Sequence, residues 1–320
     1  MDRRRGGGRP GAAARPYRDR LAHTYSIVAR DPVTGEMGAA VQSHWFSVGS
    51  IVTWGEAGVG VVATQSMTNP SFGPRGLELL RQGTDPAGAV KEMISADEGR
   101  EVRQLAVLDL KGRGAAYTGS RCIPRCGHIV GEDFSVQANM MSSDQVWPAM
   151  ARAFEETPGP LAERMVAALV AAEDAGGDFR GSQSASLLVV KGTATGHPWE
   201  DRPIDLRVED HADPVGELGR LLRVHRAYED MNEGDLAVEK GDMARALRLY
   251  GSARERCPDN EEMVFWTAAM LASNDRLDES VPLFTQVFHR NPRWREALPD
   301  LARLGHVRIE PEQVERIVRL

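Results

Sequence analysis

The segment from Gln65 to Pro74 carries small polar residues where a predicted strand gives way to a predicted helix. A helix N-terminus offers unpaired backbone N–H groups and a favourable dipole, which are the donors that an oxyanion needs. Asn69 is therefore a candidate catalytic residue and Gln65 a candidate substrate-binding residue. A plain helix cap, with Ser71 or Asn69 capping and Pro74 in the first turn, would look the same, so both interpretations stay open.

More polar residues lie at the ends of predicted strands. Gln137 and Asn139 are two positions apart, so both amides point to one face of their strand. They could bind a substrate amide, complete an oxyanion site, or satisfy loop carbonyls. Ser43 and His44 end the second predicted strand, where they either border a substrate cleft or belong to a solvated strand end.

A further polar run precedes a later strand and contains Asp178, Arg180, Gln183 and Ser184. Arg180 could read a substrate carboxylate through two parallel hydrogen bonds, or it could simply pair with Asp178 at the surface. We keep Arg180 and Gln183 as candidate substrate-binding residues.

Cys122, Cys126 and His128 form a Cys-x3-Cys-x-His cluster that suggests zinc. A structural zinc site needs four ligands, and no second pair of ligands is evident, so we expect no metal and no cofactor. The chain has 3 cysteines, an odd number that fits a reducing compartment, and we expect a cytoplasmic protein.

The elements that must position these residues follow from the apolar periodicity. Strands occur in blocks and helices occur in blocks, which indicates an α+β fold rather than alternating βαβ units. Two antiparallel sheets packed face to face, with a helix pair on each outer side, would bury every apolar face as a four-layer αββα sandwich. The predicted strands are 24–28, 37–41, 50–54, 59–64, 103–109, 115–119, 134–139, 184–190 and 204–208, and the predicted helices are 76–82, 86–96, 144–156 and 160–175.

The C-terminal part repeats with a period of 34 residues, because Pro258 aligns with Pro292 and Tyr250 aligns with Phe284. That period is typical of tetratricopeptide-like helix pairs. Fewer than three repeats are marginal alone, so we expect support from the body or from a second subunit of a homo-oligomer. The repeats could also bind a protein partner. After an amphipathic helix from residue 213 to about 232, the predicted repeat helices are 227–239, 243–256, 261–273 and 277–290, with a capping helix at 294–304.

The predicted organisation is therefore a disordered, arginine-rich extension over 1–22, an αββα domain over 23–222 and helical repeats over 223–320. The net charge of -7 argues against nucleic acid and anionic membranes as general partners. No stretch approaches the 18 or so apolar residues that a membrane span requires.

Several stretches of the body match one family together: TYSIVARDPVTGEMGAAVQS, GVGVVATQ, NPSFGPRGLELL, EVRQLAVLD, YTGSRC, GGDFRGSQSASLLVV and DLRVEDHADP. From about Thr24 to Leu222 the chain resembles a bacterial family of unknown function that is grouped with the N-terminal nucleophile (Ntn) hydrolases. The resemblance implies that Thr24 is the nucleophile and that its own α-amino group is the base. An α-amine has a pKa near ~8, so it serves as a base at neutral pH without a histidine.

Relatives usually carry this threonine after the initiator methionine, whereas His23 precedes it here. A free Thr24 amine requires cleavage of the His23–Thr24 bond, or a different start site. Without either, Thr24 is an ordinary strand residue. Ser26 faces the same side of the strand and either assists proton transfer or hydrogen-bonds a neighbouring strand.

Two hypotheses follow. In the first, the protein hydrolyses a small amide, ureido or peptide-like bond through an acyl-Thr24 intermediate. In the second, the αββα body is catalytically inactive and the helical repeats bind a partner or act as a scaffold.

Overall fold

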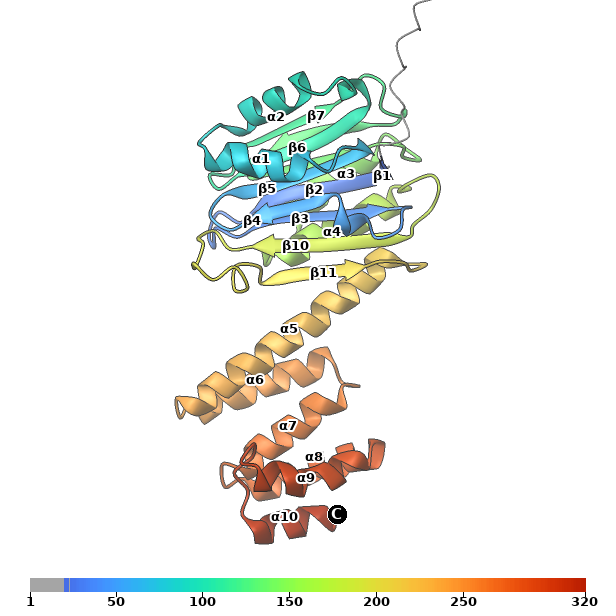
Figure 1. Cartoon of the computed structure of the whole chain (residues 1–320). Coiled ribbons are helices and arrows are strands. Elements are labelled where there is room, and N and C mark those ends of the chain that lie inside the picture. Colours follow the sequence, from blue (N-terminus) through green and yellow to red (C-terminus); the bar gives the residue numbers. More distant parts are fainter. Residues whose placement is uncertain (1–19, 23) are drawn as a thin grey trace, which may run out of the picture. The chain divides into compact units, whose positions relative to one another are not determined.

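The computed structural model describes residues 20–22 and 24–320, and the predicted disorder of residues 1–19 lies outside them. Two compact units divide the chain, one ending at Gly219 and the other comprising Arg220–Leu320. The first is a mixed α+β unit and the second is helical (Figure 1). Within the described residues, no helix is both long enough and apolar enough to cross a membrane.

The first unit contains two antiparallel sheets. Among the described residues one sheet has five strands, ordered β1-β5-β6-β7 with β4 also on β5, and the other has six, ordered β11-β10-β3-β2-β9-β8. The strands of the first sheet are β1 (Arg20–Ala22), β4 (Thr53–Glu56), β5 (Gly60–Thr68), β6 (Arg103–Asp109) and β7 (Gly114–Thr118). Those of the second are β2 (Thr24–Arg30), β3 (Met37–Ser43), β8 (Gly127–Gly131), β9 (Phe134–Ala138), β10 (Ser184–Val190) and β11 (Ile204–Val208).

Helix pairs cover the outer faces of these sheets. α1 (Phe72–Arg81) and α2 (Pro86–Ser95) pack on β5, β6 and β7, whereas α3 (Val146–Glu156) and α4 (Leu161–Asp174) pack on the other sheet, as Figure 1 shows. α2 begins where the sequence predicts, since Asp85 caps it by accepting a hydrogen bond from the Gly88 amide at 2.7 Å and Pro86 occupies its first turn.

The interior between the sheets has an apolar half and a polar half. Val28, Val41, Val61 and Leu108 belong to one fully buried apolar cluster to which both sheets contribute. Farther along the same strand faces, the buried residues are Ser26, Ser43, Gln65 and Gln104. The polar half lies at the end of the sheets where β2 begins and β3 and β5 end.

The helical unit is built from the second part of α5 (Pro214–Glu239) and the helices that follow it. Its core contains Phe265, Phe284 and Trp294, and the Phe265 and Trp294 rings are stacked with their centroids 4.3 Å apart. The remaining helices are α6 (Met243–Arg256), α7 (Glu261–Ala272), α8 (Leu277–Arg290), α9 (Arg293–Arg303) and α10 (Pro311–Val318).

Some predicted elements were wrong in detail. The predicted strand 50–54 begins only at Thr53, because Val48–Ser50 form a 3-10 turn that Ser50 closes by donating to the Ser47 carbonyl. Two predicted helices over 213–239 are one continuous helix, and β8 and α10 were not predicted. Residues 20–22, assigned to the extension, instead form β1, because pairing with β5 satisfies their backbone groups.

Candidate functional site

Thr24 is the first residue of β2, and its side chain is fully buried on the face that points toward the other sheet. Among the described residues its hydroxyl oxygen Oγ1 has no hydrogen-bond partner. Buried hydroxyls normally have one, so this atom needs an explanation. The side-chain Nε2 and Oε1 atoms of Gln42, on the opposite face of β3, also have no hydrogen-bond partner among the described residues. Of Thr24 and Gln42, only Thr24 carries a nucleophilic atom.

Hydroxyl side chains form a row across three strands at this position. Ser43 of β3 is directly opposite Thr24, and Ser184 of β10 is directly opposite Ser43. Residues that are directly opposite one another share a face of the sheet. The Ser184 hydroxyl accepts from the Val48 amide at 3.0 Å and donates to the Trp45 carbonyl, which fixes the row at its β10 end.

The backbone of Thr24 is held by three donors. Its carbonyl oxygen accepts from the backbone N–H of Asn139 at 3.0 Å, from the side-chain Nδ2 of Asn139 at 3.3 Å and from Gln65 Nε2 at 3.1 Å. Three donors on one carbonyl keep the first residue of β2 in a fixed orientation. They act on the backbone of Thr24 and leave its hydroxyl uncommitted.

The donors belong to a buried amide cluster, by which we mean Gln65, Gln104, Gln137 and Asn139. All four are 0% exposed. Gln104 is the centre, because its Oε1 accepts from Gln65 Nε2 at 2.7 Å and from Asn139 Nδ2 at 2.8 Å. Its Nε2 donates to Thr118 Oγ1 at 2.8 Å. The cluster is made of neutral groups, so it supplies directional donors without burying a charge.

Ser26 is fully engaged within the amide cluster. Its hydroxyl donates to Gln65 Oε1 at 2.6 Å and accepts from Gln137 Nε2, also at 2.6 Å. Gln137 is on β9, which pairs with β2, and Gln65 is on β5 of the other sheet, so Ser26 links the two sheets. Gln137 and Asn139 both point between the sheets, as their spacing indicates.

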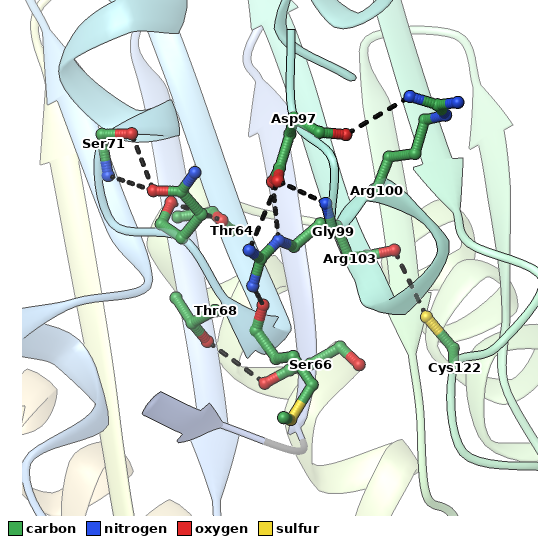
Figure 2. A network of polar contacts seen from close by, with 11 residues as sticks. Thr64, Ser66, Thr68, Ser71, Asp97, Gly99, Arg100, Arg103 and Cys122 are labelled. Atoms are coloured by element: carbon green, nitrogen blue, oxygen red, sulfur yellow. Dashed lines mark hydrogen bonds and ion pairs between the residues drawn. The ribbon is translucent and has the colours of Figure 1, made fainter. Parts of the chain in front are cut away.

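The backbone near the end of β5 is distorted at Ser66, the residue that follows Gln65. Ser66 has a φ of 71°, which is uncommon for a residue other than glycine. Arg103 of β6 holds the following peptide by donating to the Met67 carbonyl, and Arg103 Nε is 2.7 Å from Asp97 Oδ2 (Figure 2). Burial would raise the pKa of Asp97, but the hydrogen bonds from Arg103 and Gly99 outweigh it and hold that pKa below its usual value.

The remaining predicted substrate-binding residues lie around the Ser43 end of the sheet. The Gln183 amide donates to the Ser43 carbonyl at 3.2 Å, and the His44 amide donates to Asp178 Oδ2 at 3.4 Å. Arg180 Nε donates to Asp178 Oδ1 at 3.0 Å, and the Asp178 side chain is 0% exposed. The Asp178–Arg180 pair is thus a structural support at this end. Two large apolar side chains on the same loops, Phe46 and Phe179, are 63% and 57% exposed.

Asn69 lies apart from these residues. It lines a cavity of about 500 Å³ together with Ser71 and Phe72 at the start of α1 and Met93 of α2. Its side-chain oxygen accepts from the Ser71 hydroxyl at 2.7 Å and from the Ser71 amide at 3.2 Å. These contacts are those of a turn that leads into α1.

Cys122 and Cys126 precede β8, and His128 belongs to it. In the part of the chain that the structure describes, no three His, Cys, Asp or Glu side chains are grouped as metal ligands would be. Burial raises the pKa of both thiols, the opposite of what activates a cysteine. His128 Nδ1 is 2.8 Å from Thr118 Oγ1, and burial lowers the pKa of His128.

Comparison with known proteins identifies the family. Residues 24–218 match the family of unknown function DUF1028. The chain belongs to this family. The DUF1028 region begins at Thr24 and includes every residue of the amide cluster. A crystal structure of a DUF1028 protein from Silicibacter pomeroyi is similar, with 35% sequence identity, a TM-score of 0.57, and coverage of 62% of this chain and 88% of that one. No curated protein matches the chain.

The sequence analysis missed Gln104 and the role of Ser184. Gln104 interrupts the apolar face that Ala106 and Leu108 continue on β6, and a glutamine at such a position is the signal that could have found it. Ser184 was noted only as part of a polar run. Its place opposite Ser43 depends on the pairing of β3 with β10, two strands that are distant in the sequence.

Proposed function

We propose that this DUF1028 protein is an Ntn-type amidohydrolase of the αββα class, in which the Thr24 hydroxyl attacks an amide, ureido or peptide-like carbonyl. The observation that carries the proposal is the fully buried Thr24 Oγ1 at the start of β2, which has no partner among the described residues and lies beside a cluster of neutral amide donors. A nucleophilic atom without a partner, on a backbone that three donors hold still, is arranged as a preorganised nucleophile is.

The chemistry requires that the His23–Thr24 bond be broken, since only then does Thr24 have a free α-amine. The amine accepts the proton of Oγ1 as the Oγ1–carbon bond to the substrate carbonyl forms. The carbon–nitrogen bond then breaks, and the leaving nitrogen takes that proton. Water adds to the ester, releases the acid and restores the Thr24 hydroxyl. No cofactor enters any of these steps.

The other residues have positioning roles in this proposal. Gln65 and Asn139 hold the Thr24 carbonyl, and Gln104 orients both of their amides. Ser26 and Gln137 brace Gln65 and do not touch the nucleophile atom. Ser43, directly opposite Thr24, and the rim formed by His44, Arg180 and Gln183 would border the acyl group.

Mass spectrometry of the intact purified protein tests the proposal, because processing leaves a chain that begins at Thr24. A β-lactone or another electrophilic amide analogue should then add to the N-terminal residue in wild type and, more slowly, in Thr24→Ser, which keeps a hydroxyl. Thr24→Ala should remain unprocessed and unlabelled. Normal processing and labelling of Thr24→Ala would show that Thr24 is not the nucleophile.

The alternative is an inactive body with a binding function in the helical unit. One observation favours it: a cavity of about 740 Å³ within residues 228–308 is lined by Met231, Met263 and Trp266 together with Glu262 and Arg308. Such a groove would suit a segment of a protein partner or of a second copy of the chain. A purified chain that begins before residue 24, and a form cut at Thr24 that no electrophile labels, would support this alternative.

A further inference from the structure

We propose that the substrate of the Thr24 site is an extended peptide whose backbone pairs with the edge of β5 at Ser66–Thr68, where β1 now lies. The inference rests on the proposed function and narrows its substrate class from amides in general to peptide chains. The evidence comes from the strand that precedes the nucleophile.

β1 is paired antiparallel with the end of β5, with Arg20 opposite Thr68, Leu21 opposite Met67 and Ala22 opposite Ser66. On its other side β5 is paired with β6, where Ser66 is opposite Arg103. Breaking the chain before Thr24 severs β1 from the body. Loss of β1 would expose this three-residue edge of β5 and free the backbone groups that pair with β1, which is a template for another extended chain.

This edge keeps its shape through contacts that do not involve β1. Arg103 holds the Met67 carbonyl from β6, and Asp97 in turn holds Arg103. The Thr68 hydroxyl donates to the Ser66 carbonyl at 3.3 Å. Figure 2 shows these contacts, with β1 as the dark blue arrow near Thr68 and Ser66. The edge is therefore pre-formed, and a peptide that docks there need not order it.

The edge is also next to the nucleophile residue. Gln65, the neighbour of Ser66 in the chain, donates from Nε2 to the Thr24 carbonyl at 3.1 Å. A chain that follows the path of β1 approaches Thr24 from the same direction as the native segment, which continues through His23 into Thr24. The acyl side of the substrate would thus lie along β5, and its last carbonyl would meet Oγ1. The leaving amine is the part of the peptide on the C-terminal side of the broken bond.

Backbone pairing predicts a particular pattern of recognition. In an antiparallel pair, alternate residues of one strand direct their N–H groups to the partner, and the residues between them do not. Blocking the inward amides should weaken binding, while blocking the outward ones should not. Recognition by side-chain pockets would show no such alternation.

The test uses the full chain with a protease recognition sequence in place of residues 20–23. The chain is folded first, then cut so that it begins at residue 24, and the released segment is removed. Thr24→Ala in this background isolates binding from turnover. The probe is the peptide of residues 17–23, and its binding to the cut protein is measured by calorimetry. The unmodified peptide is compared with versions N-methylated at Arg20, Leu21 or Ala22. The uncut wild-type chain is the control, because β1 occupies the edge.

We expect the cut protein to bind the parent peptide and the uncut chain not to bind it. N-methylation of an inward amide should weaken binding about tenfold or more, which corresponds to about 1.4 kcal/mol. The affected position should be either Leu21 alone or both Arg20 and Ala22. No binding, or equal effects at all three positions, would overturn the inference even if an electrophile still labels Thr24. Alternating effects without any labelling of Thr24 would support the edge and reject the hydrolase.

Discussion

The two halves of the inter-sheet interior use the same strands and the same strand faces, yet they are built from different side chains. On β6, Gln104 lies in the polar half, and Ala106 and Leu108 lie in the apolar half. On β2 the change from polar to apolar occurs between Ser26 and Val28. Packing two sheets against each other needs only apolar side chains, so packing alone does not account for the polar half.

The polar half carries a cost that the apolar half does not. Each buried amide must keep its partners, because an unsatisfied buried polar group costs about 1–3 kcal/mol. What the polar half provides is direction: three donors converge on the Thr24 carbonyl. The difference indicates that the apolar half holds the sheets together by volume and that the polar half orients one residue.

Leu108→Ala in the apolar half should have the largest effect on stability. Leu108 is fully buried, so its removal leaves a cavity and should lower the free energy of unfolding by about 2–5 kcal/mol. Urea denaturation followed by hydrogen-exchange mass spectrometry would assign the loss to the first unit. Leu108→Met, which keeps the volume, is the control and should cost less than about 1.5 kcal/mol. Equal losses for the two variants would contradict packing by volume.

Gln104→Leu makes the polar half resemble the apolar half at nearly constant volume. It should cost about 2–4 kcal/mol, because Gln65, Asn139 and Thr118 each lose a partner. Labelling of processed Thr24 should fall further than stability alone explains. The control is Ala106→Ser, a small change on the same face of β6. A stable Gln104→Leu variant with full labelling would show that the amide cluster does not position the nucleophile.

Much of the fold could be predicted from the sequence, because periodicity records which face of a strand is buried. β6, β10 and β11 have the predicted bounds, as does α8. Predictions failed where local patterns are ambiguous. The apolar pair Ile51 and Val52 continues the pattern of a strand, yet it follows a 3-10 turn. β8 is bounded by glycines and none of its residues is fully buried, so only Ile129 and Val130 indicate a strand in its sequence.

The candidate site could be predicted less completely. Gln65, Gln137 and Asn139 were found from their positions at or near strand ends, and the structure brings Gln65 and Asn139 to the Thr24 carbonyl and Gln137 to the Ser26 hydroxyl. Asn69 was placed with them because it is close in sequence, but it follows the end of β5 at Thr68 and belongs to the turn that leads into α1. Which strands face one another decides whether Gln104 can contact Gln65 and Asn139, and a single sequence does not contain that information.

Asp97→Asn should have the smallest effect of the three and tests how the polar half is supported from outside. The variant loses charge-assisted hydrogen bonds to Arg103, which are worth about 1.5–3 kcal/mol at pH 7.

The pKa of Asp97 is lower in the folded protein than its usual 3.8. The stabilising effect of the Asp97 carboxylate is therefore complete above that value and disappears as the pH falls through the folded pKa. The gap in unfolding free energy between wild type and Asp97→Asn should therefore close below about pH 4. Glu92→Gln, which breaks an ion pair with Arg75 that is about half exposed, should cost less than about 1 kcal/mol. A gap that persists unchanged in acid would mean that the carboxylate charge of Asp97 does not hold Arg103, and the end of β5 would then need another support.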